Sequence, residues 1–248
     1  KNIALGLFIF SIGLFKKVVI ADTFAIWATQ GFDIATTLNL FEAWVTSLSY
    51  TFQMYFDFSG YADMAIGAAL LFNIRLPINF NSPFKATGII DFWQRWHISL
   101  STWFRDYLYI PLGGNRVSKP KLYRNLFIVF LLTGLWHGAG WNFVVWGLFH
   151  GLLLIIERLG FNKILAKISQ PLRHFYTLTA VIVGWVFFRA ENIGHAWSYL
   201  SEIFSRSLFS SPYYPGIGLT IPTIFLTMVF ILVEWIGKED KYALEKFG

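Results

Sequence analysis

The sequence has 248 residues, of which 56% are hydrophobic, 20% aromatic and only 14% charged, with a formal net charge of +6. A soluble domain carries about 25% charged residues, so this composition favours a polytopic membrane protein over the alternative, a soluble enzyme with a very large core. In a membrane protein, excess lysine and arginine mark cytoplasmic loops, so we expect a lipid bilayer and no nucleic acid as a partner.

The first apolar segment runs from Ile3 to Ala28 and is interrupted only by Lys16-Lys17, which we place at a membrane interface. Its length is sufficient for a transmembrane helix. The chain opens without an initiator methionine or a signal-peptide pattern, so we interpret Lys1 as an internal residue of a longer protein.

The stretch 41–76 is long enough for two segments, and we predict a hinge between them near Ser59-Gly60. Asp57 and Asp63 flank this hinge, so two carboxylates lie near or within the membrane. Intramembrane carboxylates are functional candidates by default. The alternative, which we favour, is that they cap helix ends at an aqueous cavity.

The segment 77–123 mixes aromatic and charged residues with proline and glycine, a pattern typical of amphipathic or re-entrant helices at the headgroup level. Its basic residues outnumber its acids, which indicates a cytoplasmic face. Between positions 95 and 124, Asp106 stands against six basic residues, namely Arg95, Arg105, Arg116, Lys119, Lys121 and Arg124.

Three further apolar stretches follow. One begins at Asn125 and continues to Ile156, either as two segments broken at 138–140 or as one long tilted helix. The others cover 177–188, with a start before Tyr176 left open, and 219–236, which precedes a charged tail. These segments predict an all-α polytopic membrane protein.

Five histidines are present, and we interpret His174 and His195, in polar surroundings, as loop or interface residues. His137 and His150 are 13 residues apart. On one helix they would point about 140° apart and lie ~20 Å apart along the axis, so they form no pair unless the glycines break the helix drastically. His150 lies within a small-xxx-small pattern and is most simply hydrogen-bonded across a tight helix contact.

Other chemistries find little support in the sequence. The chain has no cysteine, which excludes a cysteine-bound thioester and a thiolate metal site on these residues. Histidine spacings typical of metalloenzymes and the Gly-x-Ser-x-Gly elbow are also absent, so we expect no metal. A histidine acting as general base near neutral pH remains, with His137 as the candidate. Its partner would be a polar residue of the amphipathic segment, and His97 is flanked there by aromatics.

Three motifs carry a resemblance to a known family. The stretches "MYFDFSGYADMAIG", "DFWQRWHISLSTWFRDYLYIPLGGNR" and "LTGLWHGAGWNFVVWGLFHG" occur in this order. Together they resemble the membrane-bound O-acyltransferase family, in its alginate O-acetyltransferase branch of exopolysaccharide acetylation. The resemblance covers most of the chain, from about Phe15 to Asn192. Members begin with further membrane helices, so the resemblance implies that residues 1–248 are one membrane-embedded domain lacking that N-terminal part.

The resemblance also implies a reaction and a site. His137 matches the active-site histidine and His97 the second polar residue, 40 residues earlier. We expect acyl transfer from a cytosolic thioester, acetyl-CoA above all, with no bound cofactor. Gly113-Gly114-Asn115 is compatible with an anion nest, but we favour a tight turn. As donor- or substrate-binding residues we nominate Arg105, Arg116, Lys119, Trp96, Trp136 and Asn142.

The expected setting is the bacterial cytoplasmic (inner) membrane. The implied partners are an acyl donor on the cytoplasmic side, a separate extracytoplasmic acetyltransferase and polysaccharide export machinery. Three alternatives stay open: a multispanning transporter or channel lined by Asp57, Asp63 and His137, a non-catalytic scaffold, and a D-alanyl-transfer acyltransferase for cell-wall polymers.

Overall fold

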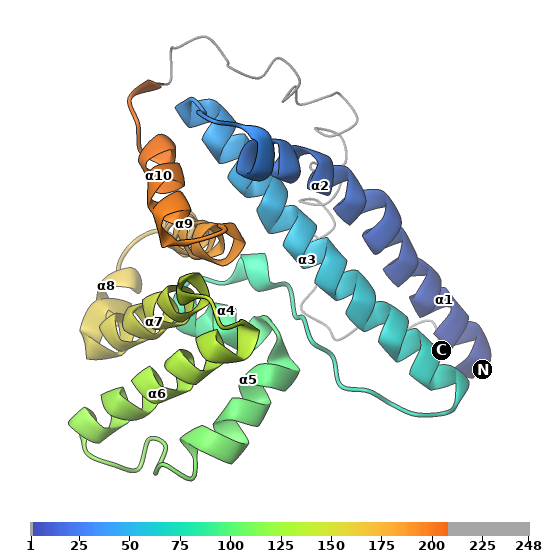
Figure 1. Ribbon diagram of the computed structural model, residues 1–248. Coiled ribbons are helices and arrows are strands. Elements are labelled where there is room, and N and C mark those ends of the chain that lie inside the picture. The colour runs from blue at the N-terminus through green and yellow to red at the C-terminus, as the bar shows by residue number, and fades with distance from the viewer. Residues whose placement is uncertain (1, 208–248) are drawn as a thin grey trace. The chain divides into compact units, whose positions relative to one another are not determined.

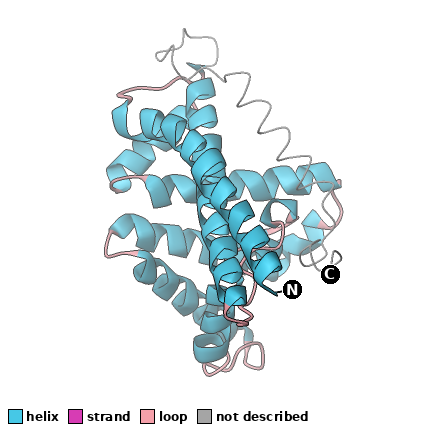
Figure 2. Cartoon of the chain, turned by 90° about the vertical axis from the view of Figure 1, so that its right-hand side faces the viewer, coloured by secondary structure: helices cyan, strands magenta, loops and turns pink. Residues whose placement is uncertain are grey.

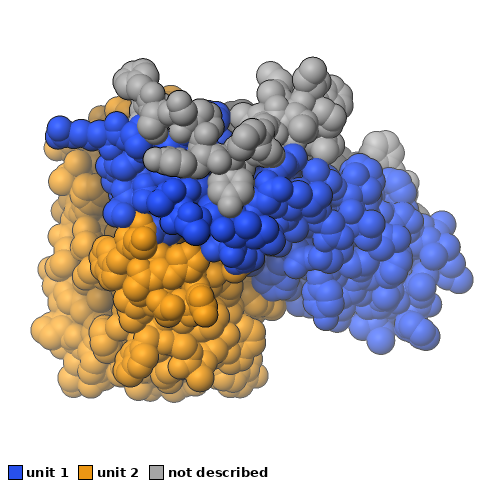
Figure 3. Space-filling view, turned by 45° about the horizontal axis from the view of Figure 1, so that its top comes forward, with its two compact units in different colours: residues 1–81, 199–248 blue, residues 82–198 orange. Residues whose placement is uncertain are grey.

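The structure is a computed structural model and describes residues 2–207. These residues form helices and connecting loops, with no strand in this part of the chain (Figure 2). The predicted span 219–236 and the charged tail after it lie outside the described residues. The chain divides into two compact units, residues 1–81 with 199–248 and residues 82–198 (Figure 3).

Three helical stretches of the described chain are long and apolar enough to cross a membrane, namely Asn2–Ile34, Trp141–Leu165 and Gln170–Arg189. This confirms the prediction of an all-helical membrane protein. The first stretch is continuous and is built from α1 (Asn2–Phe15), a π-helical turn (Lys16–Ala21), α2 (Asp22–Thr29) and a second π-helical turn (Gln30–Ile34).

The first unit is built on α3 (Leu40–Leu71), a single helix of 32 residues. The predicted hinge near Ser59-Gly60 is therefore wrong. A capping box fixes the start of α3: the Asn39 side chain accepts from the Glu42 N–H, and the Glu42 carboxylate accepts from the Asn39 N–H, both at 2.9 Å.

Glycine allows α1 to pack closely against α3 (Figure 1). A Cβ on Gly13 would lie 2.6 Å from the Gly60 carbonyl oxygen, and a Cβ on Gly6 would lie 2.7 Å from that of Gly67. Both pairs are seven residues apart in their helices, so they repeat on one face every two turns. Gly60 is thus a packing residue, which explains why α3 does not bend there.

Ion pairs also join these helices. Lys16 Nζ lies 2.7 Å from Asp63 Oδ2, and Lys17 Nζ lies 2.6 Å from Asp57 and 2.9 Å from Asp22. Both carboxylates of α3 therefore lie inside a helix and face lysines of the first π-helical turn. The expectation that they cap helix ends is wrong.

The second unit holds all five histidines of the sequence. Its elements are a 3₁₀ turn (Pro83–Lys85), α4 (Ile89–Arg95), α5 (Ile98–Phe104), a π-helical turn (Arg105–Tyr109), α6 (Lys119–His137), α7 (Trp141–Ile156), a π-helical turn (Glu157–Phe161), α8 (Asn162–Leu165) and α9 (Gln170–Arg189). The last helix, α10 (Ile193–Ile203), begins in this unit and ends in the other.

Helices α6 and α7 form a hairpin, so the first of the two predicted alternatives for 125–156 is correct. The chain reverses at 138–140, and the two helices lie side by side (Figure 1). A Cβ on Gly151 would lie 2.8 Å from the Cβ of Phe130, and a Cβ on Gly134 would lie 2.5 Å from the Phe143 carbonyl oxygen. Small residues thus let the two backbones approach.

Candidate active site

His97 lies at the sharp turn between α4 and α5. Its φ of 45° is in the left-handed region, which a non-glycine residue adopts rarely and which turns the chain abruptly. The preceding Trp96 is buried and stacks on Phe92 with ring centroids 5.6 Å apart. The buried tryptophan anchors the turn, and the half-buried His97 follows it.

A buried carboxylate fixes the start of the short helix that leads to His97. Glu157 is only 2% exposed, and its two oxygens accept the N–H groups of Ile89 at 2.6 Å and Ile90 at 3.0 Å. These are backbone donors of the first turn of α4, which have no partner inside the helix. Glu157 follows α7 directly, so it connects the helix that ends before His97 to the helical hairpin.

His137 is the last residue of α6 and lies among aromatic rings. Its ring centroid is 4.9 Å from that of Trp146, 4.9 Å from that of Trp136 and 5.1 Å from that of Phe188, all edge to face. The glycine turn that follows ends the helix at this residue. The imidazole is half-buried, with aromatic walls from α6, α7 and α9.

The structure brings His97 and His137 together around one indole ring. The Trp136 ring centroid lies 6.3 Å from that of His97 and 4.9 Å from that of His137. Both histidines lie outside the three membrane-crossing stretches. Burial lowers the pKa of His97 from 6.5 to about 4. Burial, and then the proximity of His97, lowers the pKa of His137 to about 4, so both imidazoles are neutral at pH 7.

His150 lies next to this pair, on the far side of Trp146. The Trp146 ring is 5.4 Å from the His150 ring, and the Trp93 ring is 5.2 Å from it. The glycines at 138–140 do break the helix. His137 at the end of α6 and His150 in α7 therefore both contact the ring of Trp146. His150 is fully buried in a tight helix contact, but neither ring nitrogen has a hydrogen-bond partner among the described residues, so the expected hydrogen bond across this contact is wrong.

The nominated binding residues are placed differently from one another. Trp136 is 59% exposed beside both histidines, whereas Trp96 is a core residue with little surface for a ligand. Asn142 is buried, and its amide donates to the Ala190 carbonyl oxygen at 3.0 Å, which joins the start of α7 to the end of α9. Arg105 pairs with the adjacent Asp106 at 2.7 Å on the surface.

Arg116 is exposed in the turn before α6, and Lys119 is exposed at the first position of α6. Gly113 and Gly114 have φ values of 99° and 52°, and the Arg116 N–H donates to the Gly113 carbonyl oxygen at 3.0 Å. The favoured tight turn is therefore present.

His174 and His195 were expected to be loop or interface residues; both are helical, so a loop position is wrong. His174 lies in the first turns of α9, where its Nδ1 donates to the Ala86 carbonyl oxygen at 3.1 Å. His195 lies in α10, where its Nδ1 accepts from the Glu191 N–H at 3.4 Å. The described residues hold no group of three or more metal-binding side chains.

A cavity of about 520 Å³ lies within the second unit, between α4, α5, α6 and the end of α7. Arg105 lines it, as do other polar residues, of which the sequence had pointed only to Asn115, as part of a possible anion nest. Among them are Tyr109, Asn115 and Arg158. Arg158 and Glu157 end a long apolar run, and the rule that charges in such runs are functional candidates would have identified both.

Comparisons with known proteins identify the family of the chain. The sequence profile of the membrane-bound O-acyltransferase family matches residues 1–193. A peptidoglycan O-acetyltransferase of Helicobacter pylori is 59% identical over 199 residues, which cover 79% of this chain and 38% of that protein. A protein named probable alginate O-acetylase, from Pseudomonas aeruginosa, is 50% identical over 232 residues, which cover 93% of this chain and 44% of that protein.

A teichoic acid D-alanyltransferase of Bacillus subtilis is more distant, at 35% identity over 147 residues, which cover 56% of this chain and 37% of that protein. The chain thus spans less than half the length of these curated relatives.

Proposed function

The chain belongs to the membrane-bound O-acyltransferase family, and from this premise we propose that it is the histidine-bearing part of an enzyme that O-acetylates a glycan outside the cytoplasm. The observation that carries the proposal is the convergence of His97 and His137, both neutral at pH 7, on the exposed ring of Trp136. Two relatives named for acetyl transfer, at 59% and 50% identity, favour acetyl over other acyl groups.

The proposed reaction is direct transfer from a thioester to a hydroxyl. A neutral nitrogen of His137 takes the proton of the acceptor hydroxyl as the oxygen attacks the thioester carbonyl carbon. The new C–O bond forms, the C–S bond breaks, and the thiolate leaves with the proton that His137 has held. In this one-step exchange on the bound donor, every bond that forms or breaks is accounted for without an acyl-enzyme intermediate on these 248 residues, which contain no cysteine.

His97 would act together with His137 beside Trp136. Its strained backbone fixes the imidazole at the turn, and Trp96 anchors that turn in the core. In this position it can orient His137 or donate to the carbonyl oxygen on which negative charge develops. The aromatic walls around His137 limit the access of water on the side of Trp146 and Phe188, which would slow hydrolysis of the thioester.

The donor is proposed to enter from the cytoplasm and the acceptor from the opposite side of a bacterial inner membrane. The basic segment 95–124 supports a cytoplasmic donor because positive charge accumulates on that side. The acceptor glycan, or a separate extracytoplasmic acetyltransferase that passes the group on, then completes the pathway together with the export machinery.

Substitution of each histidine in the full-length protein tests the proposal. We expect His137→Ala to abolish release of free CoA from acetyl-CoA in purified membranes and to remove O-acetyl groups from the cell's glycans, measured by mass spectrometry. His97→Ala should lower the same rate strongly, and His195→Ala, on a helix remote in sequence, serves as the matched control. Undiminished acetylation by His137→Ala would contradict the mechanism.

Assays on the same purified membranes distinguish the other candidate functions. Transport of an intact solute without thioester consumption would identify a transporter. Silent substitutions at both histidines, together with loss of complex assembly when Gly134 is replaced, would identify a scaffold. Labelled D-alanine in place of acetate on the polymer would assign the activity of the more distant relative.

A further inference from the structure

His150 is a fully buried histidine that the proposed reaction does not use. A Cβ on Gly184 would lie 2.5 Å from its Nε2, so the imidazole packs directly against the backbone of α9. Neither of its ring nitrogens has a hydrogen-bond partner among the described residues. Burying such a ring without partners costs free energy that a phenylalanine at the same position would avoid, so the presence of the two nitrogens indicates a role.

Three indole N–H groups of the same aromatic cluster are also buried without a described partner. They belong to Trp93 of α4, Trp146 of α7 and Trp185 of α9. The His150 ring centroid lies 5.2 Å from that of Trp93 and 5.4 Å from that of Trp146. The ring of Trp185 stacks on that of Trp146 at 6.1 Å. An indole nitrogen only donates, whereas a neutral imidazole offers one acceptor, so His150 is the side chain of this set that can accept.

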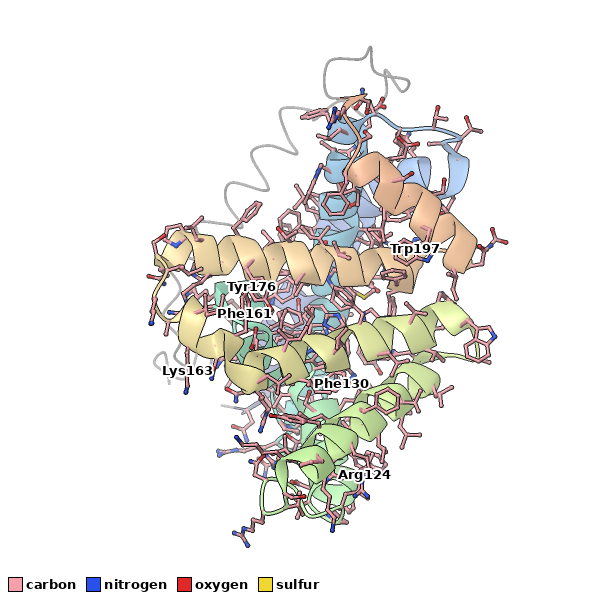
Figure 4. The ribbon with its side chains drawn as sticks, turned by 90° about the vertical axis from the view of Figure 1, so that its left-hand side faces the viewer. Arg124, Phe130, Phe161, Lys163, Tyr176 and Trp197 are labelled. Carbon is pink, nitrogen blue, oxygen red and sulfur yellow. The ribbon has the colours of Figure 1, made fainter. Side chains whose placement is uncertain are left out.

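Phe130 encloses the cluster on the side of α6 (Figure 4). Its ring centroid lies 5.3 Å from that of Trp93, and its Cβ would lie 2.8 Å from a Cβ on Gly151, the residue after His150. The polar atoms of the cluster therefore lie among aromatic rings from four helices. In such surroundings a hydrogen bond is electrostatically stronger than in water.

Trp146 connects this cluster to the candidate base. Its ring contacts that of His137 at 4.9 Å and that of His150 at 5.4 Å, edge to face in both cases. Trp146 and His150 are four residues apart in α7, so their side chains lie on the same face of that helix. Edge-to-face contacts tolerate a wide range of separations, whereas a hydrogen bond to the indole nitrogen sets the rotation of the ring.

We propose that His150 is a positioning residue, which accepts from the indole N–H of Trp146 through one buried water molecule and so holds that ring against His137. The inference rests on the proposed acyl transfer, with His137 as the base, and adds a residue that acts without touching the substrate. A buried water molecule needs about two to four polar partners, and the imidazole and indole nitrogens of the cluster supply them.

The test separates ring volume from hydrogen-bonding capacity at position 150. His150→Phe keeps an aromatic ring and removes both nitrogens, whereas His150→Gln loses the ring and keeps an amide oxygen as acceptor. His150→Phe should lower the kcat of acetyl transfer by the full-length protein in detergent roughly 10- to 100-fold, the cost of a small displacement of the base, and leave KM for the donor unchanged. His150→Gln should restore part of this kcat, although it fills the site less well and lowers the Tm.

Indole N–H resonances report on the proposed bridge without turnover. In the full-length protein with isotopically labelled tryptophan, the side-chain N–H signal of Trp146, assigned with Trp146→Phe, should shift in His150→Phe and return toward its wild-type position in His150→Gln. Trp197, an exposed indole on α10 (Figure 4), is the internal control, and its signal should stay in place. His195→Phe and His195→Gln make the same substitutions at a histidine of α10 and are the matched control variants.

A second site covers the case in which His150→Phe does not fold. Gly184→Ala places a Cβ against the imidazole and displaces it while both nitrogens remain. The Trp146 signal should shift and kcat should fall in this variant as well. An unshifted Trp146 signal in Gly184→Ala would contradict the bridge.

A role in packing alone predicts the opposite order of the two variants. His150→Phe would then retain the wild-type kcat, and His150→Gln would be the impaired one; this result would overturn the positioning role. A fall in kcat without a shift of the Trp146 signal would overturn the bridge. The signal is recorded without substrate, so it is independent of His137→Ala. If His137→Ala remained active while His150→Phe shifted the Trp146 signal, the proposed mechanism would fall and the bridge would stand.

Discussion

Glu157→Ala is the most informative single change for the position of His97. It removes a carboxylate that accepts two backbone N–H groups, those of Ile89 at 2.6 Å and Ile90 at 3.0 Å. Gly88, the residue before α4, has no side chain to replace it as a cap. The first turn of α4 would therefore lose its only side-chain acceptor described in the structure, inside a buried region.

The magnitude follows from these two hydrogen bonds. A buried donor left without a partner costs about 1–3 kcal/mol, and two such donors give about 2–6 kcal/mol. The variant also avoids the desolvation penalty of burying a charged carboxylate, which offsets part of this loss. We expect a net loss of about 3 kcal/mol in the free energy of unfolding, which appears as a lower Tm.

The assay compares thermal unfolding and acetyl transfer of the full-length protein in detergent. Because α4 ends two residues before His97, Glu157→Ala should lower kcat more than it raises KM for the donor. Glu157→Gln, which keeps one acceptor oxygen, should give about half the loss of stability. Glu191→Gln, at an exposed glutamate, is the control. Wild-type stability and kcat in Glu157→Ala would refute the positioning role.

Three other changes test separate parts of the structure. The acid limb of kcat/KM should lie near pH 4 because only neutral His137 is a base. At pH 5.5, an imidazole with a pKa of about 4 is still ~97% neutral, whereas an imidazole with the ordinary pKa of 6.5 is only ~9% neutral. Gly184→Ala should lower stability by about 1–3 kcal/mol, because its Cβ would lie 2.5 Å from His150 Nε2. Asp63→Asn should lower it by about 2 kcal/mol, because Lys16 then loses a mostly buried partner.

Each of these has its own control. An acid limb near pH 6.5 that moves with a substitution at His97 alone would contradict the assignment of the base. Gly194→Ala, where the new Cβ meets only the Asn192 side chain at 3.2 Å, should leave the Tm unchanged. For the ion pair, a double-mutant cycle with Lys16→Met should show coupling; additive effects would show that the pair contributes nothing.

The sequence predicted the membrane class and the pair of histidines, and it offered the break at 138–140 as one of two alternatives, because each depends on local composition or on motifs. The break at 138–140 follows from two glycines in three residues. The same logic failed at Gly60, where a glycine was interpreted as a hinge. A glycine that bends a helix and a glycine that admits a neighbouring helix look alike until the partner, here Gly13, is known.

Glu157 and Arg158, which the sequence did not predict as important, act through contacts that are distant in the sequence. Glu157 acts on Ile89, 68 positions away, and Arg158 acts on Asn115, 43 positions away. Neither separation along the sequence corresponds to a helix or strand period, so no residue pattern predicts these contacts. The helical arithmetic that separated His137 from His150 was correct for one helix, and it ceased to apply once the hairpin brought both rings to Trp146.

The low pKa of His137 raises a question about its strength as a base, because proton transfer is most efficient when the pKa lies near the working pH. Burial, the main cause of the low value, acts on the free site. As the hydroxyl attacks the thioester, negative charge develops on the carbonyl oxygen within the same aromatic walls, and that charge favours the imidazolium. The base would therefore become stronger only along the reaction path, which is the differential stabilisation that accelerates a chemical step. On this reasoning the aromatic enclosure keeps His137 neutral and ready in the resting enzyme, and the oxyanion supplies the missing basicity when the proton moves.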